Sequence, residues 1–495
     1  MGALSRPDAR PAATLESRPV RVASLALLLL AVTLTAAEEH TRRITWQDVA
    51  PIHARLTSRG FSAHDFDTRI ARLAADNERR VRIGDVDHLV FYMLQSTRFT
   101  DRTAIEPALS AKSLVDGLDD AWREAFFRDP ASARDRVSRD VRARVHATVE
   151  ALDAPGTNAR LAYFARLLAE TAPDARARER TLLDEYLRVM RFVHEKEFGS
   201  GRADAAAAAS LYHTRGLSTD TAVEAGFIVS QGLGVLRALD PERRIRRVLI
   251  VGAGLDLAPR TALLEAAPPQ SYQPWAVLDA LVDLGLSRLD DVTIVSADIN
   301  DRVVHHLRDS RASPPLLTLL TGIGETGPIS LAREYRAYFG SLGRSIGLME
   351  DAPPQTARDA ARAPAGHLYK RLKVSAEAAR AVRATQLDVV TERLDGRGRG
   401  GSGHTGAGFD LVVATNVFPY FDDDGLALAL SNIASMLGPG GVLLHNEARP
   451  ALHDISAALG LPPSHSRHAV IATVKGAPPL GDSVWLHERQ APPPR

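Results

Sequence analysis

Two glycines and two aspartates lie at the ends of apolar runs, where they are well placed to hold a small ligand. The run VLIVGAG ends in Gly252 and Gly254, and Asp256 follows two residues later; a second run, VTIVSADI, carries Asp298 near its end. Ligands of open parallel sheets bind beyond the carboxyl ends of the strands, so these residues are expected around one cleft. Glycine there lets the backbone approach a ligand that a Cβ would hold away.

The charge of the aspartates discriminates between two nucleotide-like ligands. A nicotinamide or flavin dinucleotide needs a third glycine beneath its diphosphate, and this sequence has Leu257 there. Asp256 would also repel the diphosphate, and no acidic residue ends a strand about twenty positions further on. A carboxylate attracts a cation, so the pattern favours S-adenosylmethionine, which carries a sulfonium and an amino group but no phosphate. An NAD-dependent oxidoreductase is the disfavoured alternative.

Asn416 and Tyr420 follow a later apolar run, FDLVVATNVFPYF. Asn416 is expected to face the methionine portion of the cofactor or the methyl acceptor; the alternative is a side chain that closes the turn before Pro419. Tyr420 is expected to shape the acceptor pocket, or else to pack in the core. Arg215, in the segment LYHTRGLSTDTAVEAG, would pair with the methionine carboxylate if this segment covers the cofactor. The alternative for that segment is a helix cap.

Proton removal would need a base if the acceptor is a hydroxyl or a protonated amine. His445 and Glu447 leave the apolar run GPGGVLLHNE near the same edge of the sheet, and Tyr420 lies close by. These three residues are therefore the candidates for catalysis. A solvated histidine and a surface carboxylate are the plain alternatives for His445 and Glu447.

The order of these motifs resembles the class I S-adenosylmethionine-dependent methyltransferases. Gly252-Ala-Gly254-Leu-Asp256 is similar to the first motif of that family, and Asp298 is similar to its acidic residue that grips the ribose. The stretch Asn416-Val-Phe-Pro-Tyr-Phe resembles the corresponding segment of chemotaxis-receptor methyltransferases. The resemblance covers about 247–490 and implies S-adenosylmethionine as cofactor, with Gly252, Gly254, Asp256, Asp298, Asn416 and Arg215 around it. It also implies methyl transfer to a small-molecule or protein acceptor.

Short apolar runs alternate with helical patterns after Pro241, which predicts an α/β fold. We expect a Rossmann-like, seven-stranded, mainly parallel sheet with a closing antiparallel hairpin, preceded by a large all-helical N-terminal region. The predicted strands span Val248–Gly254, Val292–Ile299, Leu387–Leu394, Phe409–Phe421 and Gly438–Glu447, and the hairpin spans His468–Gly476 and Asp482–Gln490.

The same patterns divide the chain into three parts. We expect residues 1–37 to form a signal peptide or membrane anchor, residues 44–239 a helical domain and residues 240–495 the Rossmann-like methyltransferase domain. The alternatives for residues 1–37 are a buried core helix and a wrongly assigned start codon. Within the last part we expect a mostly helical insertion at about 310–385 and a flexible, glycine-rich loop at 396–408.

Composition excludes several classes of site and partner. The chain of 495 residues has 61 basic and 60 acidic residues, so its net charge of +1 gives no general attraction for nucleic acid. It has no cysteine, which excludes disulfides, thiolate metal sites and cysteine nucleophiles. The spacing of the histidines indicates no metal site either.

The N-terminus raises a question of location. Four arginines precede the apolar run at 22–37, a pattern typical of a secretory signal, and membrane association through this run is the alternative. Either would place the body of the chain in the cell envelope, whereas S-adenosylmethionine is supplied on the cytoplasmic side. The competing hypothesis is therefore a non-catalytic Rossmann-like protein that binds or scaffolds in the cell envelope.

Overall fold

A computed structural model describes residues 39–199, 211–212, 215–220, 222–258, 264–265, 267–350, 366–395 and 408–490. The expected signal or anchor at 1–37 lies outside these residues, as does the glycine-rich loop except for Gly408. Within the described part of the chain, no helix has the length and apolar character needed to span a membrane.

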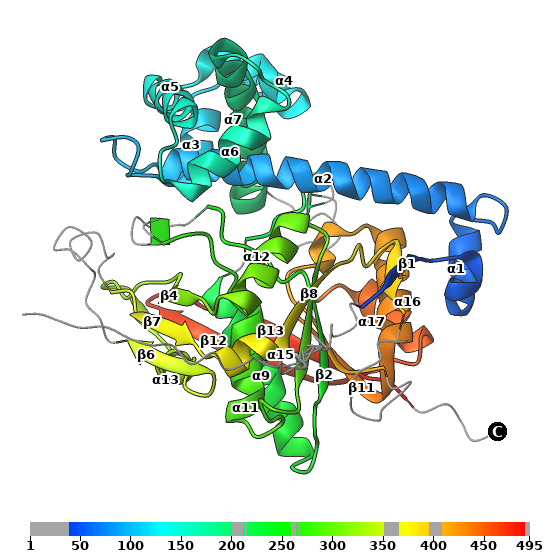
Figure 1. Ribbon diagram of the computed structural model, residues 1–495. Coiled ribbons are helices and arrows are strands. Elements are labelled where there is room, and N and C mark those ends of the chain that lie inside the picture. The colour runs from blue at the N-terminus through cyan, green and yellow to red at the C-terminus, as the bar shows by residue number, and fades with distance from the viewer. Residues whose placement is uncertain are drawn as a thin grey trace, which may run out of the picture.

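The central feature is a mixed sheet of eight strands (Figure 1). Five neighbouring strands run parallel, and the final hairpin joins them antiparallel, as the sequence predicts. The count is eight rather than seven because a short strand pairs with the hairpin at the sheet edge. In spatial order the strands are β5 (Ile329–Leu331), β12 (Pro463–Val474), β13 (Ala477–Glu488), β11 (Leu437–His445), β10 (Phe409–Ala414), β2 (Arg247–Val251), β3 (Thr293–Asp298) and β8 (Val382–Gln386).

The middle strands are apolar throughout because both faces of the sheet are covered. In β2, Val248 and Ile250 join the hydrophobic core that contains α9 (Val223–Leu239) and α11 (Gln273–Asp283). Leu249 and Val251 join the opposite core, which contains α16 (Asp423–Met436). Side chains alternate between faces along a strand, so a strand buried on both sides reads as one continuous apolar run. Each such burial contributes about 1.5–3 kcal/mol.

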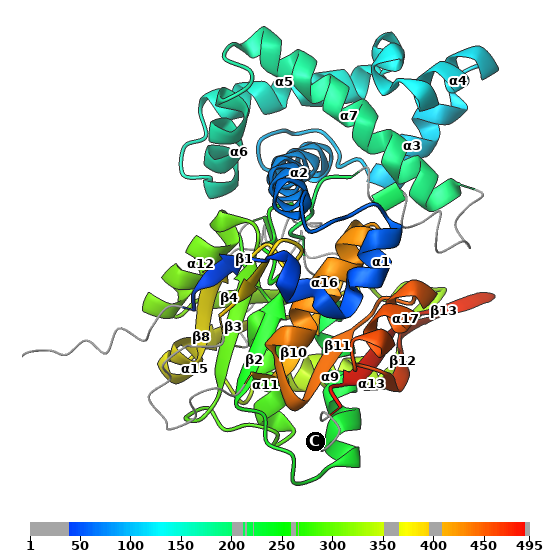
Figure 2. The ribbon, with the colours of Figure 1, turned by 90° about the vertical axis from the view of Figure 1, so that its right-hand side faces the viewer.

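The N-terminal part contacts the α/β body through two segments, a short strand with the helices after it and the long helix α2. Strand β1 (Thr41–Arg43) pairs with β9 (Glu392–Leu394), and the helices that follow it pack beside α16. The long helix α2 (Phe66–Gln95) then crosses the body. Figure 2 shows it end-on between the helices of residues 107–198 and the sheet. The helices before and after α2 are η1 (Trp46–Ile52), α1 (His53–Ser58), α3 (Pro107–Asp116), α4 (Asp120–Arg128), η2 (Pro130–Arg136), α5 (Arg139–Asp153), α6 (Ala159–Ala169) and α7 (Ala175–Phe198).

Helix α9 packs against the sheet, although the sequence places it at the end of the helical domain at 44–239. Its buried face contacts α11 and the strands β12 and β13. Its apolar spacing does not distinguish packing on other helices from packing on a sheet, so the sequence alone does not show which body it joins.

The segment at about 310–385 differs from the expected helical insertion. It holds a three-stranded antiparallel sheet, β4 (Leu316–Leu320), β7 (Tyr369–Val374) and β6 (Gly347–Glu350), together with the helices α13 (Arg333–Ser341) and α15 (Ala376–Ala381). In β7, alternate residues are buried, and the ammonium of Lys370 is buried with its chain, where it donates to the carbonyls of Phe339 and Leu342. The period of two is that of a strand, not of a helix.

The third parallel strand lies earlier than predicted. Strand β8 pairs with β3, whereas the predicted run Leu387–Leu394 begins just after β8 ends. As the edge strand, β8 is only partly buried and its sequence, VRATQ, is weakly apolar. Residues 387–390 leave the sheet instead, and residues 387–389 line the site described next.

Candidate functional site

A cavity opens at the carboxyl ends of four parallel strands. Residues that follow β2, β3, β8 and β10 form its floor and walls, and α2 and the segment 217–220 also line it. This is the edge of the sheet where open α/β folds bind their ligands.

The glycine turn after β2 forms one wall. Gly252 and Gly254 both line the cavity and have positive φ angles of 73° and 74°, which glycine adopts without strain. A Cβ on Gly252 would lie 2.7 Å from Cγ2 of Val417 on the facing loop. The structure thus brings both predicted glycines to the site, and Gly252 has no room for a side chain.

Asp298, at the end of β3, is the second predicted residue in the cavity. Its carboxylate accepts hydrogen bonds from the backbone N–H of Gly254 at 3.1 Å and of Asn300 at 2.9 Å. Burial nevertheless raises the pKa of Asp298 to about 6. The carboxylate is therefore fixed in orientation and retains lone pairs for a further hydrogen-bond donor.

Asp256 does not share this cavity, contrary to the sequence prediction. Its carboxylate lies 3.6 Å from the guanidinium of Arg160, in a neighbouring hollow that also borders Glu224. The backbone N–H of Asp256 donates to the carbonyl of Gln270, so the chain has already turned away from the cavity. Asp220 lines both hollows.

Asn416 and Tyr420 line the opposite wall, after β10. Asn416 has a positive φ of 60°, and Asn446 holds it by donating to its side-chain oxygen and accepting from its backbone N–H, each at 2.8 Å. Tyr420 is half-buried, with its ring edge-on to Tyr212, and burial raises the pKa of its phenol. Both lie where the sequence predicts, and the phenol is protonated at neutral pH.

His445 and Glu447 lie outside the cavity. His445 is fully buried between Phe418 and His487, with ring centroids 5.6 Å and 4.9 Å away, and burial holds the pKa of His445 well below its usual value. Glu447 forms an ion pair of 3.3 Å with Arg449. Although β11 ends at the correct edge of the sheet, His445 turns toward the hairpin and neither side chain lines the cavity, so neither is placed to act as a base there.

Arg215 faces the helical part of the chain. Its guanidinium lies 3.4 Å from Asp87 of α2 and stacks 4.8 Å from the ring centroid of Phe192. The segment around Arg215 does cover the cavity, as expected, through residues 217–220, but the arginine itself is not a lining residue.

Asp388 is a site residue that the sequence analysis missed. It follows β8, lines the cavity and accepts a hydrogen bond of 3.1 Å from the side chain of Asn77 on α2. Burial raises the pKa of Asp388. Its position was hidden because the third strand was predicted to begin at Leu387, which would place Asp388 inside the sheet.

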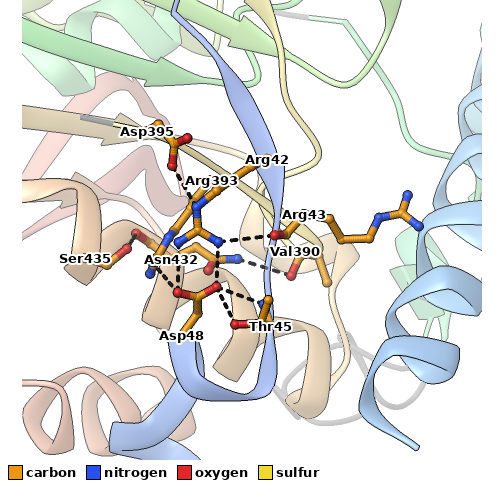
Figure 3. Close-up of polar contacts among 9 residues, drawn as sticks. All are labelled: Arg42, Arg43, Thr45, Asp48, Val390, Arg393, Asp395, Asn432 and Ser435. Atoms are coloured by element: carbon orange, nitrogen blue, oxygen red, sulfur yellow. Dashed lines mark hydrogen bonds and ion pairs between the residues drawn. The ribbon is translucent and has the colours of Figure 1, made fainter. Parts of the chain in front are cut away.

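Polar contacts hold α16 and the N-terminal segment against residues 389–393, which directly follow Asp388 (Figure 3). Asn432 of α16 donates to the carbonyls of Val389 and Val390, at 2.9 Å and 3.2 Å. Beside it, Asp48 accepts two hydrogen bonds from Arg42, at 2.6 Å and 2.8 Å, and another from Arg393. The N-terminal segment is thus fastened to β9, shortly after Asp388 in the sequence.

The charged side chains that line the cavity are all acidic. They are Asp220, Asp298 and Asp388, and none of the lysines, arginines or histidines in the described ranges lines it. In a partly buried site of this kind, negatively charged carboxylates attract a cationic ligand and repel an anionic one. The arrangement can accept hydrogen bonds from hydroxyl and amino groups, and it does not favour phosphates.

Comparisons with known proteins find similarity at the level of structure only. No protein-family model matches the chain, and no curated protein matches it. The N-methyltransferase NodS of Bradyrhizobium japonicum WM9, solved with S-adenosyl-L-homocysteine, is 13% identical, covering 53% of this chain and 86% of its own, with a TM-score of 0.24. The magnesium protoporphyrin IX methyltransferase ChlM of Synechocystis PCC 6803, solved with bound SAM, is 8% identical, covering 60% and 94%, with a TM-score of 0.27.

A third solved structure, TrmN from Thermus thermophilus, is 14% identical, covers 52% of this chain and 47% of its own, and has a TM-score of 0.23. At these identities and TM-scores the three similarities assign neither substrate nor site residues.

Proposed function

We propose that this protein binds S-adenosylmethionine in the cavity and transfers its methyl group to a small-molecule or protein acceptor. The observation that carries the proposal is the charge of the cavity: three carboxylates and a glycine turn, at the carboxyl ends of parallel strands. S-adenosylmethionine supplies a methyl group on a sulfonium that is already an activated leaving group. The protein mainly has to align the acceptor, and alignment can contribute about 7–11 kcal/mol.

The same charge argues against a dinucleotide. A diphosphate in this cavity would lie among Asp220, Asp298 and Asp388, with no cation among the described lining residues to offset the repulsion. Leu257, which stands where a dinucleotide fingerprint requires its third glycine, is a buried core residue. Binding of NAD would need positive charge or uncharged donors where this cavity carries carboxylates.

Each wall of the cavity suits one part of the proposed cofactor. Asp298, with its orientation fixed by two backbone N–H groups, is assigned to the ribose hydroxyls, and Gly252 and Gly254 to close approach of the backbone. Asp388, whose carboxyl oxygens accept hydrogen bonds, is assigned to the exocyclic amino group of adenine. Asn416 is assigned to the methionine portion or to the acceptor.

The acceptor side is assigned to Tyr420. Its protonated phenol can orient an acceptor through a hydrogen bond, but it is a poor base at neutral pH. His445 and Glu447 are withdrawn as bases because they lie elsewhere. Asp220, an exposed carboxylate in the cavity, is the group that can accept a proton if the acceptor carries one.

Substitution of Asp298 tests the proposal. Asp298→Asn keeps the size of the side chain but replaces an acceptor oxygen with a donor, so S-adenosylhomocysteine should bind about tenfold or more weakly by calorimetry, as expected for loss of a charge-assisted hydrogen bond. Asp256→Asn is the matched control, because this equally buried carboxylate lies by Arg160 and should leave the affinity nearly unchanged. Equal affinity in wild type and Asp298→Asn would refute the site.

A further inference from the structure

Helix α2 carries one polar face that holds the loops around the cavity. Residues 77, 80, 81, 84, 85 and 88 are spaced three or four apart and therefore share one side of the helix. Arg80 donates to the carbonyl of Tyr420 at 2.8 Å, and His88 lies 2.8 Å from the hydroxyl of Ser218. With the Asn77–Asp388 contact, this face reaches the loops after β8 and β10 and the segment 217–220.

The backbone of α2 also lies unusually close to that segment. The N–H of Leu217 donates to the carbonyl of Arg80 at 2.9 Å. A Cβ on Gly84 would lie 1.9 Å from the carbonyl oxygen of Leu217. Helix and segment therefore form one packed layer over the cavity, with no space for a side chain between them.

The remaining contact on this face reaches the loop after β3. Asp85 is fully buried, and its carboxylate accepts from the side chain of Asn300 at 3.1 Å and from Arg302 at 2.8 Å. Arg302 in turn stacks on the ring of Tyr163, 4.7 Å from its centroid. A buried carboxylate costs free energy unless it is paired. Here the two partners of Asp85 lie more than 200 positions away in the sequence, so the contact joins α2 to the segment that follows β3.

Asn300 connects this contact to the predicted ligand. Its side chain points to Asp85, while its backbone N–H donates to the carboxylate of Asp298. We propose that Asp85 is a positioning residue: by holding Asn300 and Arg302 from α2, it fixes the Asp298 carboxylate in the orientation that binds the cofactor ribose. This inference rests on the proposed function, and it makes the helical part of the chain a determinant of cofactor affinity.

The pH dependence of ligand affinity distinguishes an electrostatic and positioning role of Asp85 from a contribution to stability alone. Burial raises the pKa of Asp298, the N–H of Asn300 lowers it, and the charge of Asp85 adds a smaller rise. The other charged or titratable groups nearby are Asp220, Asp388 and Tyr420 in the cavity, Arg302 and Tyr163 on the Asp85 carboxylate and His88 on α2. Removing the Asp85 charge should therefore place the acid-side loss of ligand affinity at lower pH than in a variant that loses only the Asn300 contact.

Three variants of the full-length protein test the proposal. Asp85→Asn removes the charge and the acceptor for Asn300. Asn300→Ser removes the same hydrogen bond from the other side, but serine preserves the N-cap that Asn300 provides for α12 (Asp301–Ala312). Asp87→Asn is the matched control: it removes another buried carboxylate of α2, one that pairs with Arg188 and Arg215 and not with the β3–α12 loop.

Two measurements are made on each variant: calorimetric affinity for S-adenosylhomocysteine between pH 5 and pH 8, and amide hydrogen exchange of residues 298–302 without ligand. Asp85→Asn and Asn300→Ser should each weaken binding about tenfold and speed exchange in that segment. The pH midpoint should be lower in Asp85→Asn than in Asn300→Ser, because both variants loosen the Asn300 N–H bond to Asp298 but only Asp85→Asn also removes the neighbouring charge. Asp87→Asn should leave the midpoint and the exchange unchanged.

A folded Asp85→Asn protein with wild-type affinity, midpoint and exchange would overturn the proposal. If Asp85→Asn does not fold, wild-type exchange and affinity in Asn300→Ser would overturn it equally. If wild type does not bind S-adenosylhomocysteine but exchange at 298–302 rises in both variants, the positioning contact stands and the proposed cofactor is wrong.

Discussion

Gly84 in the middle of α2 provides a test with an unusual sign. In a helix interior, glycine is about 1 kcal/mol less favourable than alanine, so Gly84→Ala should stabilise an isolated helix. In this protein the added Cβ would lie 1.9 Å from the carbonyl oxygen of Leu217, whereas real Cβ contacts essentially never fall under 3.0 Å. Helix and segment must therefore separate by more than 1 Å. Such overpacking typically costs about 1–3 kcal/mol, so we expect net destabilisation of up to about 2 kcal/mol.

Gly234 of α9 is the matched control. It also lies inside a helix, but a Cβ there would meet nothing within 4 Å. Urea denaturation should give a lower midpoint for Gly84→Ala and a slightly higher midpoint for Gly234→Ala, by about 0.5–1 kcal/mol in free energy. S-adenosylhomocysteine should also bind Gly84→Ala more weakly, because the moved segment lines the cavity. If both substitutions stabilise the protein alike, the close approach of α2 to residues 217–220 is wrong.

Two further predictions concern the glycine turn after β2 and the ion pairs of Asp48. Gly252→Ala puts a Cβ 2.7 Å from Val417 at a φ of 73°, so calorimetry should show a loss of S-adenosylhomocysteine affinity larger than that for Gly234→Ala; equal affinities would contradict the role of the turn. Asp48→Asn should lower the free energy of unfolding by about 2 kcal/mol at pH 7, since its hydrogen bonds to arginine are charge-assisted. Arg42 holds the pKa of Asp48 below its value in the unfolded chain, so this stabilisation is present above about pH 4 and is lost as the pH falls further. Denaturation curves of the two proteins should therefore converge in acid, and a constant difference down to pH 2 would refute the account.

The sequence predicted elements whose signal is local. Strands β2, β3, β10 and β11 read as apolar runs because both of their faces are buried, and Gly252, Gly254 and Asp298 could be placed because they directly follow such strands. The weakly apolar edge strand β8 gave no such signal, and Asp388 was missed with it.

Side-chain direction beyond a strand end could not be predicted. Asp256 and Arg215 both lie in segments correctly placed near the cavity, but each turns to a partner in the helical part, Arg160 or Asp87. His445 turns to a histidine of the final hairpin, more than forty positions away. Such partners are set by packing between segments that are far apart in the sequence. The spacing of residues within one segment therefore gives no information about them. The polar face of α2 was missed for the same reason.

The central claim is that an acidic cavity at the carboxyl ends of β2, β3, β8 and β10 selects a cationic methyl donor. Parallel calorimetric titrations of the wild-type protein with S-adenosylmethionine and NAD⁺ test it most directly. The account predicts saturable binding of S-adenosylmethionine and no measurable binding of NAD⁺. Binding of NAD⁺, or heat from neither compound, would contradict it.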